Sequence, residues 1–150
     1  MPNSRKRPPG LSVIAVILSL LAISGFLNAF IWAQLSASLP PEAPAHLRSG
    51  VNILASPAVS AAAILYAITA LCAAAGIWRM SPWAPVAILT WGASVFILGG
   101  IFVVVGPQMV DSQISPLFLV CAGFGGAVVA IAIVTSTWLY VRRNVARVDL

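Results

Sequence analysis

The chain has 150 residues, of which 61% are hydrophobic and 7% are charged, and its mean hydropathy is +1.03. Soluble domains are typically about 45–50% apolar and about 25% charged, so the composition excludes a soluble enzyme, a disordered tail and a soluble nucleic-acid binder. The remaining class is an integral membrane protein. At about 20 residues for each crossing, the length allows roughly four or five helices and leaves no room for a separate soluble domain.

Four apolar stretches are each long enough to cross a bilayer as a helix. They cover residues 11–34, 57–78, 82–106 and 116–141, with outer loops at 35–56 and 107–115 and short tails at 1–10 and 142–150. The first stretch is longer than the roughly 7–15 apolar residues of a secretory signal, so we interpret it as a span that is retained. The sequence predicts an all-α integral membrane protein, folded as a four-helix bundle with short loops.

Three of the four stretches begin at a serine followed by a proline: Ser56-Pro57, Ser81-Pro82 and Ser115-Pro116. A serine hydroxyl can accept a hydrogen bond from an unpaired backbone N–H of the first turn, and a proline at the first helical position gives up an N–H that would lack a partner. These pairs therefore predict where the second, third and fourth helices start. A very tight turn around Arg79 and Met80 is expected between the second and third helices.

The net charge of +5 comes from basic residues that lie beside the predicted spans. Of the eight Lys and Arg residues, only Arg48 falls in an outer loop, and the others lie in the two tails or at the turn between the second and third spans. The positive-inside rule makes that side the cytoplasm. We therefore predict a multi-pass protein of the inner or plasma membrane with both termini in the cytoplasm. The basic charges are expected to attract anionic lipid rather than nucleic acid.

Small residues recur at regular spacing in the third and fourth spans. Gly92 and Gly99 are seven residues apart, and Ala122, Gly126 and Ala130 recur every four residues. Helices in lipid associate where small side chains let their backbones approach, so we predict that these positions pack the helices of the bundle. A second membrane protein, or a second copy of the chain, is the alternative partner for the same faces.

The four predicted spans contain no Asp, Glu, Lys, Arg or His. Proton-coupled pumps use such groups at membrane depth, so an ion-coupled transporter is disfavoured. The residues expected to line any intramembrane pocket are Asn28, Tyr66, Trp91, Ser94 and Thr135. Asn28 is the most informative of these, because an amide has four hydrogen-bonding positions that lipid cannot satisfy.

Residues suited to metal or redox chemistry are few. Glu42, His46 and Asp111, all on the predicted outer side, could together hold zinc, although ordinary solvated loop charges are the reading that we favour. Cys72 and Cys121 differ in depth by roughly 15 Å at 1.5 Å per residue, which is too far for a disulfide. We therefore assign no catalytic residue, no metal site and no cofactor.

These features predict a small polytopic membrane protein that acts as an accessory, assembly or packing subunit of a membrane complex. Its partners would be the lipid bilayer and either another membrane protein or further copies of itself. The alternative is an uncoupled channel or small-solute permease formed by the bundle or by a homo-oligomer. Convergence of Asn28 and Ser94 on a water-accessible cavity would favour transport, whereas burial of these side chains against one another would favour the accessory role.

Overall fold

The computed structural model describes residues 8–109 and 116–146, except for the side chains of 102, 105–124 and 146. These residues form five helices: α1 (Pro9–Ser38), α2 (Ala45–Leu54), α3 (Pro57–Trp78), α4 (Ala84–Met109) and α5 (Pro116–Ala146). Four of them, α1, α3, α4 and α5, are long and apolar enough to cross a membrane. The all-α class and the four long apolar helices predicted from the sequence are confirmed.

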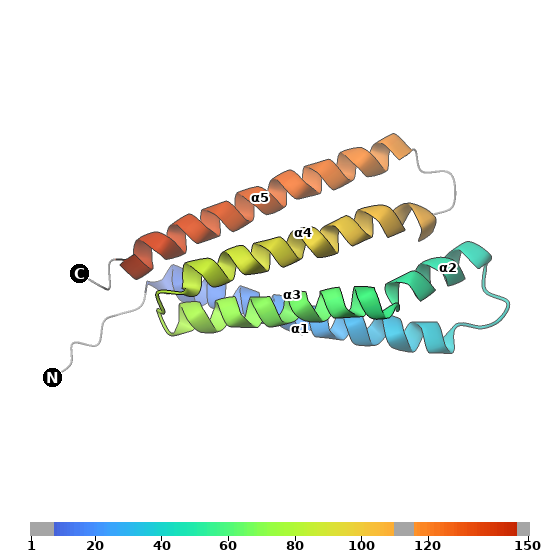
Figure 1. The fold of residues 1–150 in the computed structure, drawn as a ribbon, viewed down its shortest axis with the longest axis horizontal. Helices are drawn as coiled ribbons and strands as arrows, with labels where there is room; N and C mark the ends of the chain where they lie inside the picture. The colour runs from blue at the N-terminus through green and yellow to red at the C-terminus, as the bar shows by residue number, and fades with distance from the viewer. Residues whose placement is uncertain (1–7, 110–115, 147–150) are drawn as a thin grey trace.

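The four long helices run in alternating directions along the longest axis of the molecule (Figure 1). The start of α1, the turn between α3 and α4, and the end of α5 therefore lie at the same end. That end carries Arg79, Arg142 and Arg143, and we refer to it as the basic end. The opposite end carries α2, and we refer to it as the α2 end.

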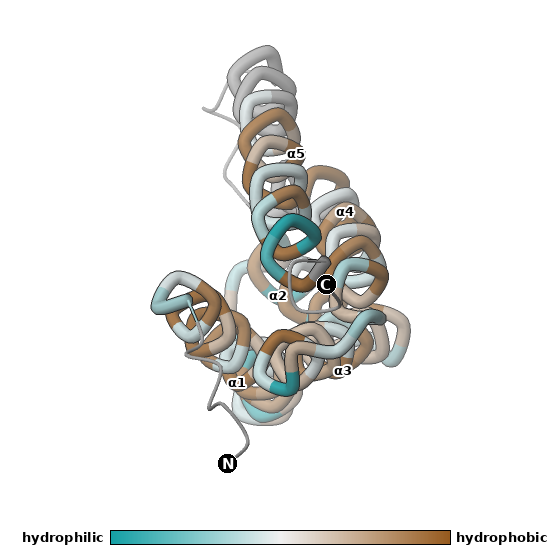
Figure 2. Tube along the Cα trace, turned by 90° about the vertical axis from the view of Figure 1, so that its left-hand side faces the viewer, coloured by the Kyte–Doolittle hydropathy of each residue, from teal (hydrophilic) through white to brown (hydrophobic). Residues whose placement is uncertain are grey.

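The long helices pack in chain order, with α1 against α3, α3 against α4, and α4 against α5. Seen end-on, they form a curved row in which α5 lies beyond α4 from α1 and α3 (Figure 2). At the basic end the row closes on itself, because Gly10 of α1 lies directly against the ring of Tyr140 on α5. Leu11 also belongs to the same buried cluster as Val141 and Val145. The bundle is therefore closed at the basic end and more open toward the α2 end.

The packing of α1 against α3 uses small side chains on both helices. The buried positions of α1 recur every three or four residues and are Leu11, Ala15, Leu18, Ala22 and Gly25. Those of α3 include Ala63, Ala67, Ala70, Ala74 and Ile77, at the same spacing. Such a repeat keeps one seam in contact while two helices supercoil. A Cβ on Gly25 would lie 3.1 Å from the Cβ of Ala67 and 3.3 Å from the carbonyl oxygen of Ala63, so this close approach depends on glycine.

A tight turn reverses the chain between α3 and α4. Met80 has a φ of 53°, in the left-handed region. The backbone N–H of Ser81 donates to the carbonyl of Gly76 at 2.9 Å, and the N–H of Met80 donates to that of Ile77 at 3.0 Å. This is the hydrogen-bond pattern of a Schellman motif, which satisfies the last carbonyls of a helix. The turn continues beyond Ser81, so α4 begins at Ala84, two residues later than its serine–proline pair predicted.

The region predicted as a long outer loop, residues 35–56, contains a helix. α1 continues to Ser38, and a short turn then leads into α2. Gly50, Val51 and Leu54 of α2 are buried, and the helix packs mainly against α4 and α1. The prolines that indicated a loop lie before α2, and the residues after them are amphipathic, which is typical of a helix that covers its apolar face on a neighbour.

Arg48 stabilises the turn before α2. Its guanidinium donates to the carbonyl oxygen of Pro41 and, at 3.5 Å, to that of Pro40. The forked N–H groups of arginine suit two neighbouring acceptors. Arg48, the basic residue that was predicted on the outer side, therefore has a local structural role.

The remaining helix ends lie close to the expected positions. Ser56 caps α3, and its Oγ accepts a hydrogen bond from the N–H of Val59 at 3.4 Å. α4 ends at Met109 and α5 at Ala146, against expected ends at 106 and 141. The structure does not describe the rest of the second outer loop, which includes Ser115, or most of either tail.

Candidate functional site

A pair of hydroxyl groups joins α3 to α4. The Oγ1 of Thr69 and the Oγ of Ser94 are 2.9 Å apart, within hydrogen-bonding distance, and both residues are buried. Each hydroxyl also lies within hydrogen-bonding distance of a carbonyl of its own helix, that of Trp91 for Ser94 and that of Tyr66 for Thr69. The polar atoms of these two residues are therefore satisfied inside the protein.

An aromatic pair lies beside the hydroxyl pair. The ring centroids of Tyr66 and Trp91 are 6.4 Å apart, and the ring planes are inclined by 44°. Trp91 is buried, while Tyr66 is partly buried. Aromatic pairs in such tilted arrangements contribute about 0.5–1.5 kcal/mol beyond the burial of their area, so the contact adds to the packing of α3 on α4.

A cavity of about 160 Å³ lies at the α2 end, and we refer to it as the α2 cavity. Its lining comes mainly from α1 and α3 and comprises Ser24, Gly25, Asn28, Ala29, Trp32, Leu54, Val59, Ser60, Ala63, Tyr66 and Leu98. The side-chain amide of Asn28 donates to the carbonyl of Ser24 at 3.1 Å. The Nε1 of Trp32 is buried and has no hydrogen-bond partner among the described residues. The volume would hold several water molecules at about 30 Å³ each.

The five predicted pocket residues do not share one site. Asn28 and Tyr66 both line the α2 cavity, and Trp91 lies against Tyr66. Ser94 is instead hydrogen-bonded toward α3, and Thr135 is exposed on α5. The orphan N–H of Trp32 was not anticipated, because the sequence indicated only that this tryptophan lies near the end of a span.

A larger groove, of about 670 Å³, lies between α4 and α5, and we refer to it as the α4–α5 groove. It is lined by Val95, Phe96, Gly99, Gly100, Val103, Val104, Gly126, Ala127 and Ala130. None of these side chains is polar. The groove is therefore suited to an apolar occupant.

Some of the predicted packing residues contact a neighbouring helix, and others line this groove. A Cβ on Gly92 would lie 2.7 Å from the Cγ1 of Val134, so α4 and α5 touch there. Among the residues that the structure describes, no atom lies within 4 Å of a Cβ placed on Gly99 or Gly126, and both glycines line the groove together with Ala130. The difference arises because α4 and α5 separate toward the α2 end (Figure 1). The side chain of Ala122 lies outside the described residues.

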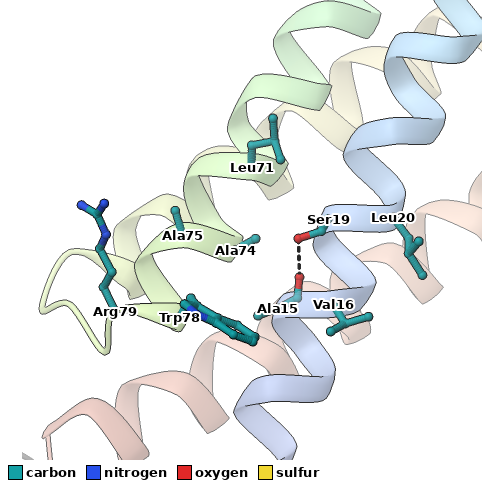
Figure 3. Close-up of a pocket in the computed structure, with 9 residues that line it drawn as sticks. All are labelled: Ala15, Val16, Ser19, Leu20, Leu71, Ala74, Ala75, Trp78 and Arg79. Atoms are coloured by element: carbon teal, nitrogen blue, oxygen red, sulfur yellow. Dashed lines mark hydrogen bonds between the residues drawn. The ribbon is translucent and has the colours of Figure 1, made fainter.

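A third hollow, of about 500 Å³, lies between α1 and α3 at the basic end, and we refer to it as the α1–α3 groove (Figure 3). It is lined by Ala15, Val16, Ser19, Leu20, Leu71, Ala74, Ala75, Trp78 and Arg79. The sequence did not indicate it, because a groove between two helices depends on how closely they approach and not on either helix alone.

The residues considered for metal or redox chemistry are dispersed. Glu42 and His46 are exposed at the α2 end, and Asp111 lies outside the described residues. Within the described part of the chain, no three His, Cys, Asp or Glu residues form a group that could hold a metal ion. Cys72 is an exposed free thiol, and the side chain of Cys121 is not described.

Comparison with protein-family models, with curated proteins and with solved structures finds no match to this chain. The two grooves and the α2 cavity are the features of the described residues that could receive another molecule. Their lining residues offer shape, hydrocarbon contact and a few hydrogen bonds.

Proposed function

We propose that this protein is an accessory or packing subunit of a membrane complex, and that a transmembrane helix of another membrane protein docks in the α4–α5 groove. The observation that carries this proposal is the open surface of small residues in the groove. Gly99, Gly100 and Gly126 line it, and a Cβ on any of them would meet no atom of the described residues within 4 Å. Small residues at such a surface let the backbone of a second helix approach closely.

The chemistry of the groove favours a helix over a hydrated solute. All nine lining residues are apolar or glycine, and Val103 and Val104 at its wall are exposed. A polar solute would have to give up its water without gaining hydrogen bonds there, which is costly. A partner helix has its backbone groups already paired and brings only side chains to the contact.

The alternative, an uncoupled channel or permease, has less support. Transport would be favoured if Asn28 and Ser94 converged on one water-accessible cavity. Asn28 lines the α2 cavity, whereas Ser94 is buried against Thr69. Asn28 and Ser94 are therefore not buried against one another either, but the bond of Ser94 to Thr69 joins α3 to α4 and supports a packing role.

We also propose that the basic end faces the cytoplasm, with both termini on that side of an inner or plasma membrane. Arg79, Arg142 and Arg143 lie at this end, and the positive-inside rule assigns such an end to the cytoplasm. A reporter fused to the C-terminus should be active only inside the cell. Activity only outside the cell would contradict this orientation.

The proposed partner is tested on full-length protein extracted from its own membrane into nanodiscs. Native mass spectrometry should show a stoichiometric, heterologous membrane protein bound to it. Ala130→Leu places a bulky side chain in the groove and should release that partner. Ala132→Leu is the matched control, because Ala132 is exposed on the same helix and does not line the groove.

Two results would overturn the proposal. The first is a homogeneous homo-oligomer or an isolated monomer, which would favour the channel or permease alternative. The second is a partner that both alanine variants retain equally, because it would then bind elsewhere.

A further inference from the structure

The α1–α3 groove opens between two candidate membrane spans at the basic end. Its lining runs along α3 from Leu71 and reaches Arg79 just beyond the end of that helix, eight steps along the chain, or about 12 Å at 1.5 Å per residue. One leaflet contributes half of a hydrocarbon core of roughly 30 Å, so the groove extends through most of one leaflet. The volume of about 500 Å³ lies within the range of roughly 300–1,000 Å³ that is typical of small-molecule sites.

The walls of the groove present hydrocarbon. Val16, Leu20 and Leu71 are between 42% and 61% exposed, so their side chains are available to an occupant and are not consumed by packing inside the chain. The hydroxyl of Ser19, which also lines the groove, donates to the carbonyl of Ala15 at 2.9 Å. Its polarity is therefore satisfied within α1 (Figure 3).

The end of the groove near the α3–α4 turn is positively charged and aromatic. Arg79 lines this end and is exposed, with its guanidinium extended away from α1, whereas the ring of Trp78 reaches from α3 toward α1 (Figure 3). Arg142 lies at the same end of the molecule, with its guanidinium 5.1 Å from the centre of the Trp138 ring. Glu42 is the only carboxylate side chain among the described residues, and it lies at the opposite end.

We propose that the α1–α3 groove binds one anionic phospholipid. Its acyl chain lies between α1 and α3, and its phosphate is held by the exposed Arg79 side chain once that side chain turns toward the groove. Tryptophan rings favour the boundary between hydrocarbon and headgroups, so Trp78 marks the depth of the glycerol. Basic pockets between spans on the cytoplasmic side are suited to anionic headgroups. This inference does not depend on the partner proposed for the α4–α5 groove.

The test is native mass spectrometry of the full-length protein, titrated in detergent with phosphatidylglycerol or phosphatidylcholine. We expect the first bound lipid to be phosphatidylglycerol by preference. Arg79→Gln should reduce that preference about fivefold, the ratio that corresponds to roughly 1 kcal/mol per charge near an anionic surface. Arg143→Gln is the matched control, because Arg143 is exposed at the same end and does not line the groove.

A second variant tests the acyl-chain part of the site. Ala75→Leu fills the groove from an exposed position, so it should reduce binding of the first lipid while leaving the fold intact, as checked by circular dichroism. Inorganic phosphate in excess should not displace the lipid, because it cannot fill the groove.

Three results would overturn the proposal. One is an equal loss of preference in Arg79→Gln and Arg143→Gln, which would indicate attraction to the basic end as a whole. Another is undiminished lipid binding by a folded Ala75→Leu variant. The third is displacement of the lipid by phosphate, which would indicate a simple anion site.

Discussion

Replacing Gly25 with alanine is expected to loosen the contact between α1 and α3. The new Cβ would lie 2.9 Å from the Cδ1 of Tyr66, 3.1 Å from the Cβ of Ala67 and 3.3 Å from the carbonyl oxygen of Ala63. The tyrosine ring can turn away, but the other two atoms are fixed by the backbone of α3. The helices must therefore move apart along a seam that also holds Ala22.

The magnitude follows from comparing this change with Gly126→Ala. An inserted methyl group in a well-packed interface costs about 1–3 kcal/mol, whereas alanine is favoured over glycine in a helix by about 1 kcal/mol. A Cβ on Gly126 meets no atom of the described part of the chain within 4 Å, so that variant should gain only the helical preference. Because both variants share this gain, the difference between their free energies of unfolding should be about 1–3 kcal/mol.

The assay is unfolding of the purified protein in mixed micelles of increasing SDS content, followed by circular dichroism. Gly25→Ala should unfold at a lower SDS fraction than Gly126→Ala. If the two variants unfold together, or if Gly126→Ala is the less stable, the inferred roles of the two glycines are refuted.

Three further outcomes are expected. A double-mutant cycle of Thr69→Ala and Ser94→Ala should give a coupling free energy of about 0.6 kcal/mol and at most roughly 1.7 kcal/mol, the range measured for polar pairs between membrane helices; additive effects would show that the two hydroxyls do not interact. Gly92→Ala should likewise be about 1–3 kcal/mol less stable than Gly126→Ala, since the β-branched Val134 cannot easily turn aside; equal SDS unfolding of these two variants would contradict this contact. Ser56→Ala should lower the free energy of unfolding by an amount near the low end of the ~0.5–2 kcal/mol that is usual for a helix cap, because the hydrogen bond to Ser56 is long, at 3.4 Å. A thermal-unfolding curve identical to that of the parent protein would argue against a capping role.

The long helices could be predicted because crossing a bilayer imposes a minimum apolar length, and Ser56-Pro57 gave the start of α3 through local hydrogen bonding alone. α2 was not predicted. Its amphipathic pattern spans only Ala45–Leu54, directly after a cluster of prolines that favours a turn. A helix of this length gains its stability mainly from covering an apolar face, which is a property of the neighbouring helices.

The packing residues show what spacing can and cannot predict. The glycines at 92, 99 and 126 all allow close approach, but only the angle between α4 and α5 decides that Gly92 touches a helix and the other two do not. The seam of Ala15, Ala22 and Gly25 on α1 was not recognised. Apolar residues surround α1 on all sides, so no hydrophobic face distinguishes the packed side of the helix from the lipid side.

The turn at Met80 also has a consequence for biogenesis. Only residues 79–83 separate α3 from α4, so neither helix can be placed in the bilayer far from the other. At roughly 5–20 residues per second, a ribosome completes the 26 residues of α4 within about 1–5 s of finishing the turn. We therefore expect the two helices to enter the membrane as one hairpin. The hydrogen bond between Thr69 and Ser94 can then form within that hairpin, because both of its partners belong to α3 and α4.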